Sequence, residues 1–386
     1  MIADTSRSMR VLYVIDSLGH GGAEQSLAEM APYLVQNGID LHVAVLHDRE
    51  GFTGRVRAAG AAVHSVAGDH GRVGWLRRLR ALERSVQPDL IHTTLFDSDV
   101  LGRVVAAAGR KPVVSSWVNI QYGDAYDREF PAGRSKLAAV KAIDLVTSHV
   151  VRRFHAVSTP VAEAMSAEMH VNPDHVEVIP RGRDRARLGE PGTERRRRVR
   201  RRLGLDSEPV VLSVARQDHA KGLDVLLRAW RSVVIEMPDA VLLLAGRDGT
   251  RSEALRTMVD ESRLHANVRF LGVRDDVPDL LCAADAFALP SRREGLPGAL
   301  LEAMALEVPI VATDIPTILD AVPGSEYAEL VTMDDQVTLA TALLNTLSDR
   351  PGAAARAERS RARFDERFAV SQVASQMCSF YAGATS

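Results

Sequence analysis

Two glutamates interrupt an otherwise apolar stretch and give this sequence its clearest chemical signal. Residues 294–302 read E-G-L-P-G-A-L-L-E, so Glu294 lies in a turn rich in Gly and Pro and Glu302 lies in a predicted helix. A carboxylate beside a helix N-terminus can accept two hydrogen bonds from a sugar or ribose diol, and the N–H groups of that helix end attract phosphate. The alternative is structural, with Glu294 stabilising the helix start and Glu302 exposed to solvent. The spacing alone leaves both interpretations open.

A pair of cations follows another apolar run. Residues 209–215 predict a buried strand, and the loop after it carries Arg216 and Lys221 in the pattern R-Q-D-H-A-K-G. A guanidinium binds a diphosphate through two parallel hydrogen bonds, and an ammonium adds a point charge. Two cations at one strand end therefore suit a leaving diphosphate. Two exposed surface charges without a ligand are the alternative.

A glycine-rich loop near the N-terminus has the form of a phosphate-binding turn. Residues 10–15 predict a strand, D-S-L-G-H-G-G follows, and residues 23–35 predict a helix with one apolar face. Units of this kind in α/β proteins hold phosphates on backbone N–H groups. Glu24 stands where the dinucleotide-binding motif has its third glycine, so Gly21 and Gly22 do not by themselves separate a phosphate site from a tight turn.

One histidine is placed where a ligand can reach it. The residues P-D-L-I-H predict a strand that ends at His92, and open α/β sheets bind ligands at the carboxyl ends of their strands. His92 is therefore a candidate for the acceptor side of a site, with a structural histidine as the alternative.

These motifs together resemble one enzyme family. The E-x7-E spacing of Glu294 and Glu302, the R-x4-K-G pairing of Arg216 with Lys221 and the N-terminal G-G-A-E are similar to those of the retaining glycosyltransferases of family 4, which have the GT-B fold. The resemblance spans nearly the whole chain and is densest over residues 210–314. It implies that Glu302 binds the ribose of a nucleotide sugar and that Glu294 contacts hydroxyls of the sugar. It also implies that Arg216 and Lys221 bind the donor phosphates.

The resemblance gives the full set of expected site residues. The catalytic candidates are Glu294, Arg216 and Lys221. The donor-binding candidates are Gly21, Gly22, Arg216, Lys221, Gly246, Glu294, Gly295, Leu296, Pro297, Gly298 and Glu302. The acceptor-side candidates are His92 and Asn119, and no metal ligand is among the expected residues.

Several positions depart from the family pattern. Relatives often carry His or Arg near the end of one strand of the first domain, where this chain has Val118 beside Asn119. Arg181 and Arg183 replace Asn and Val in a turn that resembles I-P-N-G-V-D. Glu307 stands where relatives usually have the glycine that ends a helix, so we expect a different helix cap there.

Strand and helix patterns alternate along the chain, and they do so twice over. This alternation predicts the α/β class, with two doubly wound, parallel-sheet (Rossmann-like) domains that face a cleft, as in the GT-B fold. The expected parts are an acceptor-side domain over residues 1–188 and a nucleotide-sugar domain over residues 189–366. A C-terminal helix over residues 367–386 is expected to cross back to the first domain.

The reaction that the resemblance implies is hexosyl transfer with retention. The donor is a UDP- or GDP-sugar, the acceptor is a hydroxyl of a glycan or lipid-linked molecule, and the process is cell-envelope or exopolysaccharide biosynthesis. We expect no cofactor and no metal, because Arg216 and Lys221 supply positive charge. Two alternatives stay open: a sugar-nucleotide epimerase on the same fold, and a non-catalytic scaffold that binds a nucleotide sugar. The family residue missing at Val118 is the one indication for the scaffold.

Bulk properties exclude several other classes. The chain has 386 residues, 46% hydrophobic and 25% charged, with a net charge of -2 and two cysteines. This balance argues against a polyanion-binding protein, and two cysteines cannot form a disulfide framework. The start of the chain lacks the apolar core of a signal peptide, and no apolar run approaches the ~18 residues that span a bilayer. We expect a cytoplasmic protein, with the inner face of the cell membrane as an alternative location.

Two arginine-rich segments raise the question of a membrane or nucleic-acid partner. Residues 72–86 carry an apolar stripe among arginines, which favours a surface helix packed on the sheet and leaves peripheral contact with anionic lipid as the alternative. Residues 194–205 read E-R-R-R-R-V-R-R-R-L-G-L, with no aromatic residue interleaved. We expect a solvated helix there and no nucleic-acid binding, again with anionic lipid as the alternative.

Overall fold

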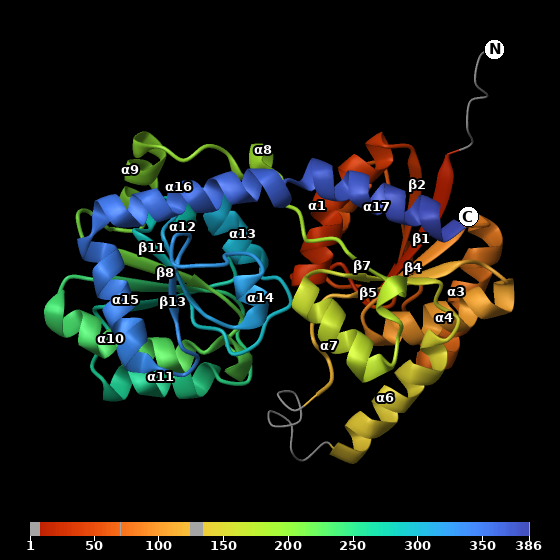
Figure 1. Ribbon diagram of the computed structural model, residues 1–386, viewed down its shortest axis with the longest axis horizontal. Helices are drawn as coiled ribbons and strands as arrows, with labels where there is room; N and C mark the ends of the chain where they lie inside the picture. The colour runs from red at the N-terminus through yellow and green to blue at the C-terminus, as the bar shows by residue number, and fades with distance from the viewer. Residues whose placement is uncertain (1–7, 70, 124–133, 386) are drawn as a thin grey trace, which may run out of the picture. The chain divides into compact units, whose positions relative to one another are not determined.

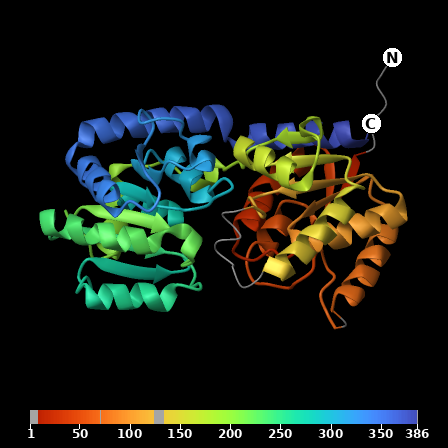
Figure 2. The same ribbon diagram turned by 60° about the horizontal axis from the view of Figure 1, so that its bottom comes forward.

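The computed structural model describes residues 8–69, 71–123 and 134–385, which form two compact α/β units. The first unit comprises the chain up to Arg183 together with the residues from Val370 onward, and the second comprises Asp184–Ala369. The sequence predicted boundaries at 188/189 and 366/367. Each unit has one parallel sheet with helices on both faces (Figures 1 and 2), which confirms the predicted fold class.

The first unit is built on a 7-stranded parallel sheet. Its strands, in spatial order, are β3 (Ala62–Ser65), β2 (Ile39–Val45), β1 (Met9–Ile15), β4 (Leu90–Thr94), β5 (Val113–Trp117), β6 (Arg153–Ala156) and β7 (Val176–Val178). Its helices are α1 (Gly22–Gln36), α2 (Thr53–Ala58), α3 (Gly71–Val86), α4 (Phe96–Gly109), α6 (Arg134–Ser148), α7 (Thr159–Met169) and α17 (Val370–Thr385).

Strand β1 shows why this sheet is covered on both faces. Its side chains alternate between the faces, and both sets are apolar, as is usual for a strand buried in a parallel sheet. Val11 and Ile15 pack in one buried cluster with α1 and α17, while Leu12 and Val14 pack in another with α3 and α4. The strand predicted over residues 10–15 is therefore confirmed, and the structure places it between β2 and β4.

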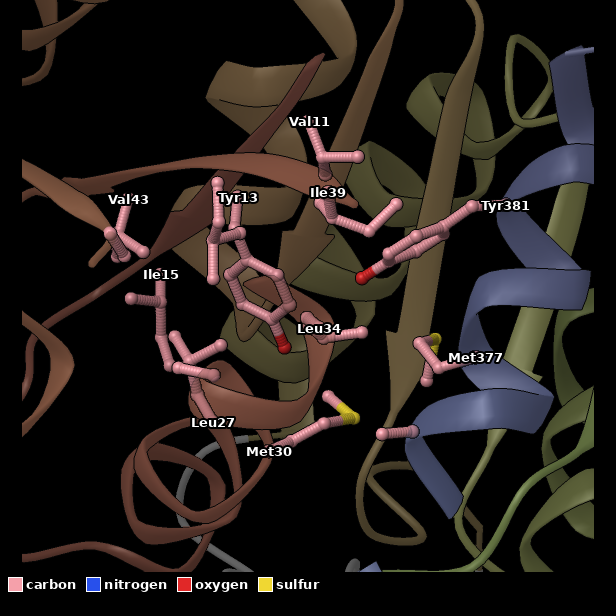
Figure 3. Close-up of a cluster of buried hydrophobic side chains, with 14 of the residues drawn as sticks. Val11, Tyr13, Ile15, Leu27, Met30, Leu34, Ile39, Val43, Met377 and Tyr381 are labelled. Carbon is pink, nitrogen blue, oxygen red and sulfur yellow. The ribbon is translucent and has the colours of Figure 1, made fainter. Parts of the chain in front are cut away.

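The C-terminal helix α17 belongs to the first unit. It packs beside α1, and Met377 and Tyr381 point from it into the cluster that Tyr13 and Leu34 help to fill (Figure 3). The chain leaves the first unit after Arg183 and returns to it at Val370. A hydrogen bond of 3.2 Å from Val370 N to Arg183 O joins these two segments.

The second unit is built on a 6-stranded parallel sheet. Its strands, in spatial order, are β10 (Val268–Gly272), β9 (Val241–Ala245), β8 (Val210–Val214), β11 (Ala286–Leu289), β12 (Ile310–Thr313) and β13 (Glu329–Val331). Its helices are α8 (Arg185–Leu188), α9 (Thr193–Arg202), α10 (Leu223–Glu236), α11 (Ser252–Glu261), α12 (Val277–Ala283), α13 (Gly298–Ala305), α14 (Pro316–Leu319), α15 (Gln336–Ser348) and α16 (Arg350–Arg367), and a short 3-10 helix η3 spans His219–Lys221.

The end of α13 differs from the sequence-based expectation. Glu307 has a φ of 55°, so it adopts the left-handed conformation itself, and Val308 N bonds to Ala303 O at 3.0 Å, as in a Schellman motif. The prediction of a different cap at this position is wrong. An ion pair of 3.4 Å between Arg361 and Glu307 partly offsets the cost of this conformation in a residue that is not glycine.

Candidate active site

Two neighbouring strand ends of the second unit bring Lys221 and Glu294 together. Strands β8 and β11 pair directly, so the loops that follow them share one edge of the sheet. Lys221 Nζ lies 2.7 Å from Glu294 Oε1, and Ser291 Oγ donates to the same oxygen at 2.7 Å. Glu294 is 7% exposed, so its carboxylate is held in place by an ammonium and a hydroxyl group. The structure thus joins two candidates that the sequence placed far apart in the chain.

A glycine fixes the turn that carries Lys221. Gly222 has a φ of 63°, and a Cβ at this position would overlap the carbonyl oxygen of Pro290. Only glycine allows this close approach without strain. The turn after β8 therefore packs directly on the loop that leads to Glu294.

Arg216 is held by an acidic residue that sequence reasoning missed. Its guanidinium forms an ion pair with Asp218, and the Arg216 side chain stays 48% exposed. Asp218 Oδ1 also accepts from Thr250 N at 2.9 Å, which ties the loop after β9 to the loop after β8. Gly246 begins that second loop, where a Cβ would overlap Ala215 O. The pattern R-x-D was the only signal of Asp218 in the sequence.

Helix α13 carries the second glutamate of the pair. Glu302 is 4% exposed and has a polar partner, so the interpretation of Glu302 as a solvated helix residue is wrong. Pro297 occupies the N-cap position of α13, one residue before the first helical residue. Gly295 and Leu296 form the turn between Glu294 and the N-cap, with Leu296 buried, and Gly298 is the first residue of the helix.

The glycine loop of the first unit is covered by two side chains. Gly21 is the N-cap of α1, and a Cβ there would overlap the carboxylate of Glu24, which folds back over the start of its own helix. A Cβ on Gly22 would lie 2.6 Å from Nη1 of Arg181. Ser17 Oγ donates to Glu24 Oε1 at 3.3 Å, and burial raises the pKa of Glu24. A carboxylate from α1 and a guanidinium from the segment after β7 therefore lie against this loop.

His92 is fully buried and takes part in a chain of hydrogen bonds. His155 Nε2 lies 2.7 Å from the carbonyl oxygen of Ile179, which can only accept, so this nitrogen carries the proton. Ser116 Oγ then donates to His155 Nδ1 at 2.7 Å and accepts from His92 Nε2 at 2.6 Å. Tyr381 Oη donates to His92 Nδ1 at 2.7 Å. Both nitrogens of His92 are thus engaged inside the first unit.

Burial keeps both imidazoles of this chain neutral. Desolvation lowers the pKa of His155 to about 4 and the pKa of His92 well below its usual value. A neutral imidazole has one donor and one acceptor nitrogen, which the directions of the four hydrogen bonds require. The chain links β4, β5 and β6 to the C-terminal helix, and no short-range pattern in the sequence predicts Tyr381 as a partner.

Two departures from the family pattern are in contact. Arg181 Nη2 donates to the backbone carbonyl of Val118 at 3.3 Å. The neighbouring candidate Asn119 is half-buried, and its Oδ1 accepts from Ile120 N at 2.9 Å. The guanidinium therefore lies beside the segment where relatives carry His or Arg.

The arginine-rich helix α9 is largely paired with acidic residues of its own unit. Arg195 contacts Asp279 at 2.8 Å, and Arg196 and Arg200 both contact Asp285. The inward-facing arginines of this helix therefore attach it to α12 and to the segment before β11, so this helix is only partly solvated.

In helix α3 the apolar stripe packs on the sheet. Trp75, Leu76 and Leu82 lie against a buried cluster, while Arg77 and Arg84 stay exposed. The favoured interpretation of this segment is confirmed. Among the described residues, no helix combines the length and apolarity needed to span a bilayer.

Metal binding was not expected. Within the described ranges, the structure contains no group of at least three His, Cys, Asp or Glu side chains arranged to hold a metal ion.

Two family models match the chain. The model described as Glycosyltransferase Family 4 matches residues 20–187, and the model described as Glycosyl transferases group 1 matches residues 208–349. Together they span most of both units.

Curated relatives are similar over part of their length. The UDP-Gal:alpha-D-GlcNAc-diphosphoundecaprenol alpha-1,3-galactosyltransferase of Escherichia coli is 24% identical over 265 residues, which cover 68% of this chain and 67% of that protein. The lipopolysaccharide core biosynthesis mannosyltransferase LpsB of Rhizobium meliloti (strain 1021) is 31% identical over 191 residues, which cover 47% of this chain and 54% of that protein. The chain thus matches between about half and two thirds of these relatives.

Solved structures share the fold. HepE of Anabaena, crystallised with UDP and glucose, superposes with a TM-score of 0.86 at 21% sequence identity, over 97% of this chain and 100% of that chain. At this level of identity the likeness concerns the fold.

Proposed function

Because this chain belongs to the family 4, group 1 glycosyltransferases, we propose that it transfers a hexosyl unit, with retention, from a nucleoside-diphosphate sugar to a hydroxyl group of a glycan or lipid-linked acceptor. The donor is a UDP- or GDP-sugar. The E. coli relative is named for a UDP-linked donor and a diphospholipid acceptor, which makes UDP the first nucleotide to test.

The observation that carries this proposal is the contact between Lys221 and Glu294. The 2.7 Å ion pair places a cation and a buried carboxylate side by side at the carboxyl edge of the sheet, where α/β proteins bind ligands. The cation suits the donor phosphates and the carboxylate suits the sugar hydroxyls. Lys221 ends the short helix η3 and Glu294 lies in the segment before α13, so neither side chain belongs to the apolar core of the sheet.

The proposed chemistry is mainly electrostatic. The bond between the anomeric carbon and the phosphate oxygen breaks, and the acceptor oxygen forms the new bond on the same face of the sugar. The acceptor proton passes to an oxygen of the departing diphosphate. Arg216, Lys221 and the N–H groups at the start of α13 stabilise the charge on that diphosphate, with each preorganised donor worth on the order of a few kcal/mol. Glu302 fixes the ribose and Glu294 orients the sugar.

Asp218 gains a role in this scheme. It holds the guanidinium of Arg216 by an ion pair and anchors the loop from Gly246 to Thr250. When a diphosphate binds Arg216, Asp218 continues to hold and orient the guanidinium from the other side. Asp218 is therefore a positioning residue, and no metal or cofactor is required in this proposal.

The remaining features concern place and pathway. We assign the reaction to cell-envelope or exopolysaccharide biosynthesis in the cytoplasm, in keeping with the relatives that act on lipid-linked and lipopolysaccharide acceptors. Arg77 and Arg84 on the exposed side of α3 are available for peripheral contact with anionic lipid at the inner face of the membrane.

A thermal-shift titration tests the donor site. Full-length protein and the Glu302→Ala variant are titrated with UDP, GDP, ADP and CMP. Selective stabilisation by one nucleoside diphosphate, lost in the variant, supports the site and names the base. Stabilisation by none of the four nucleotides would contradict the donor site.

Transfer itself is tested with the corresponding nucleotide sugar. A glycosyltransferase releases the nucleoside diphosphate in an acceptor-dependent reaction, and Glu294→Ala abolishes turnover. An epimerase converts the donor without an acceptor, and a scaffold binds the nucleotide but converts nothing.

A further inference from the structure

A small cavity lies inside the first unit, beneath the start of α1. Its polar wall is formed by Tyr13, Thr94, Ser116, His155 and Arg181, which come from β1, from the last residues of β4, β5 and β6 and from the segment after β7. The opposite wall is apolar and comes mainly from α1 and the C-terminal helix α17. Every residue that lines the cavity belongs to the first unit.

The charge of this lining is positive. Among the described residues that form the cavity wall, Arg181 is the one with a charged side chain, because burial keeps His155 neutral and no carboxylate takes part. The guanidinium packs on Gly22, with its Nη1 2.6 Å from where a Cβ would stand, and donates from Nη2 to Val118 O. A cation held in this way beside hydroxyl groups is suited to an anionic oxygen.

The size of the cavity limits what it can hold. Its volume is about 30 Å³, room for about two water molecules on the same measure. Two oxygens of a tetrahedral anion match this space. Ser26, Val118 and Pro180 line the cavity and are half-exposed, so they mark the side from which such a group would enter.

One acidic residue acts against an incoming anion. Glu24 folds over Gly21 and is attracted by Arg181, yet it does not line the cavity. A bound anion and the Glu24 carboxylate therefore compete for the same guanidinium. Removal of the Glu24 charge should strengthen anion binding, while removal of the Arg181 charge should weaken it.

We propose that Arg181 and this cavity form a phosphoryl-binding site, which receives a phosphate group of one of the two substrates. This inference rests on the proposed function, since a diphosphate donor and a phosphate-bearing acceptor are the two sources of such a group. All residues of the proposed site belong to the first unit.

The test uses methyl phosphate as the probe, because it offers a phosphoryl group without a sugar or a base. Its affinity is measured by thermal shift on the full-length protein and on Arg181→Gln, Glu24→Gln and Arg57→Gln. Arg57 lies exposed on α2, so its variant controls for the loss of one positive charge in the same unit. We expect about 10- to 100-fold weaker binding in Arg181→Gln. We expect tighter binding in Glu24→Gln and no change in Arg57→Gln.

A repeat in saturating UDP separates the two sources of the phosphoryl group. Binding that depends on Arg181 and persists with UDP assigns the site to the acceptor, and binding that UDP removes assigns it to the donor diphosphate. Both outcomes support the site. Equal affinity in Arg181→Gln and Arg57→Gln, or weaker binding in Glu24→Gln, would overturn it. If Arg181→Gln does not fold, the increase expected for Glu24→Gln still decides.

These results are independent of the donor-site test. Stabilisation by a nucleoside diphosphate that Glu302→Ala removes would support the proposed function even if methyl phosphate shows no dependence on Arg181. If no nucleoside diphosphate stabilises the protein but methyl phosphate still binds in an Arg181-dependent way, the donor site would be contradicted and the phosphoryl-binding site supported.

Discussion

The ion pair between Lys221 and Glu294 predicts an asymmetry between two substitutions. Lys221→Met leaves a buried carboxylate, 7% exposed, that among the described residues keeps only the hydrogen bond from the Ser291 hydroxyl. Glu294→Gln instead leaves an ammonium whose side chain is 24% exposed and which water can solvate. The lysine variant should therefore be the less stable of the two.

The magnitude follows from the burial of each partner. Breaking a fully buried ion pair costs roughly 3–5 kcal/mol, and the partial exposure of Lys221 reduces this to about 2 kcal/mol for Lys221→Met. The glutamine keeps a hydrogen bond with Ser291, so Glu294→Gln should cost about 0.5–1 kcal/mol. In the double variant no charge remains, and its loss of stability should be smaller than the sum of the two single losses by about 1 kcal/mol or more.

Scanning calorimetry of the full-length variants at pH 7 measures this asymmetry. For a unit of this size, 1 kcal/mol corresponds to roughly 2–4 °C, so Lys221→Met should lower the Tm by about 4–8 °C. Arg231→Met, at an exposed position of α10 in the same unit, is the control and should change little. Equal losses in Lys221→Met and Glu294→Gln, or losses that simply add, would refute the reasoning, because they would mean that the carboxylate is not held by the ammonium.

Further predictions concern single positions elsewhere in the two units. Glu307→Gly should stabilise the protein by about 0.5–1 kcal/mol in denaturant unfolding, because glycine adopts the φ of 55° without strain; a loss of stability would show that the Glu307 side chain outweighs its conformation. Tyr381→Phe should cost about 1–3 kcal/mol, because it leaves His92 Nδ1 buried without its donor, and hydrogen exchange should report faster opening of α17; unchanged exchange would contradict this. His155 has a folded pKa of about 4, below its unfolded value of 6.5, so its stabilising contribution is complete above pH 6.5 and is lost as the pH falls toward 4. The buried Asp99, with a pKa raised to about 7, opposes this trend, so the measurement is the stability advantage of wild type over His155→Gln, which should shrink by up to about 1.4 kcal/mol per pH unit as the pH falls from 6.5 toward 4; parallel pH profiles would contradict it.

The fold was predictable because each strand carries its own signal. Runs such as residues 10–15 are apolar on both faces, which is typical of central strands in parallel sheets, and the glycines between them mark the loops. The pairing of β8 with β11 was not predictable in the same way, since many residues separate the two strands in the sequence. The sequence gives the end of each strand but not which ends lie side by side.

The candidate site was predictable in its residues but only partly in its contacts. The sequence assigned Lys221 and Glu294 to different parts of a donor, and the structure brings them into direct contact. Asp218 was missed because an acidic residue in a loop has many possible roles. The bond between Tyr381 and His92 spans 289 residues and depends on where the C-terminal helix packs, which local patterns do not determine.

The contact between Arg181 and Val118 bears on the choice between an enzyme and a scaffold. Read in the sequence alone, Val118 was the one indication of lost chemistry, because relatives often carry a cation or imidazole there. Arg181 was a separate departure some sixty positions later, with no evident link to it. In the structure the guanidinium of Arg181 donates to the backbone of Val118, packs on Gly22 and lines the cavity beneath α1. A positive group therefore lies beside this segment after all, supplied from a different strand end. Val118 lacks the cation or imidazole of the relatives, and Arg181 supplies a guanidinium beside it. The indication for a scaffold is therefore removed, and Arg181 is the residue of the first unit to substitute first.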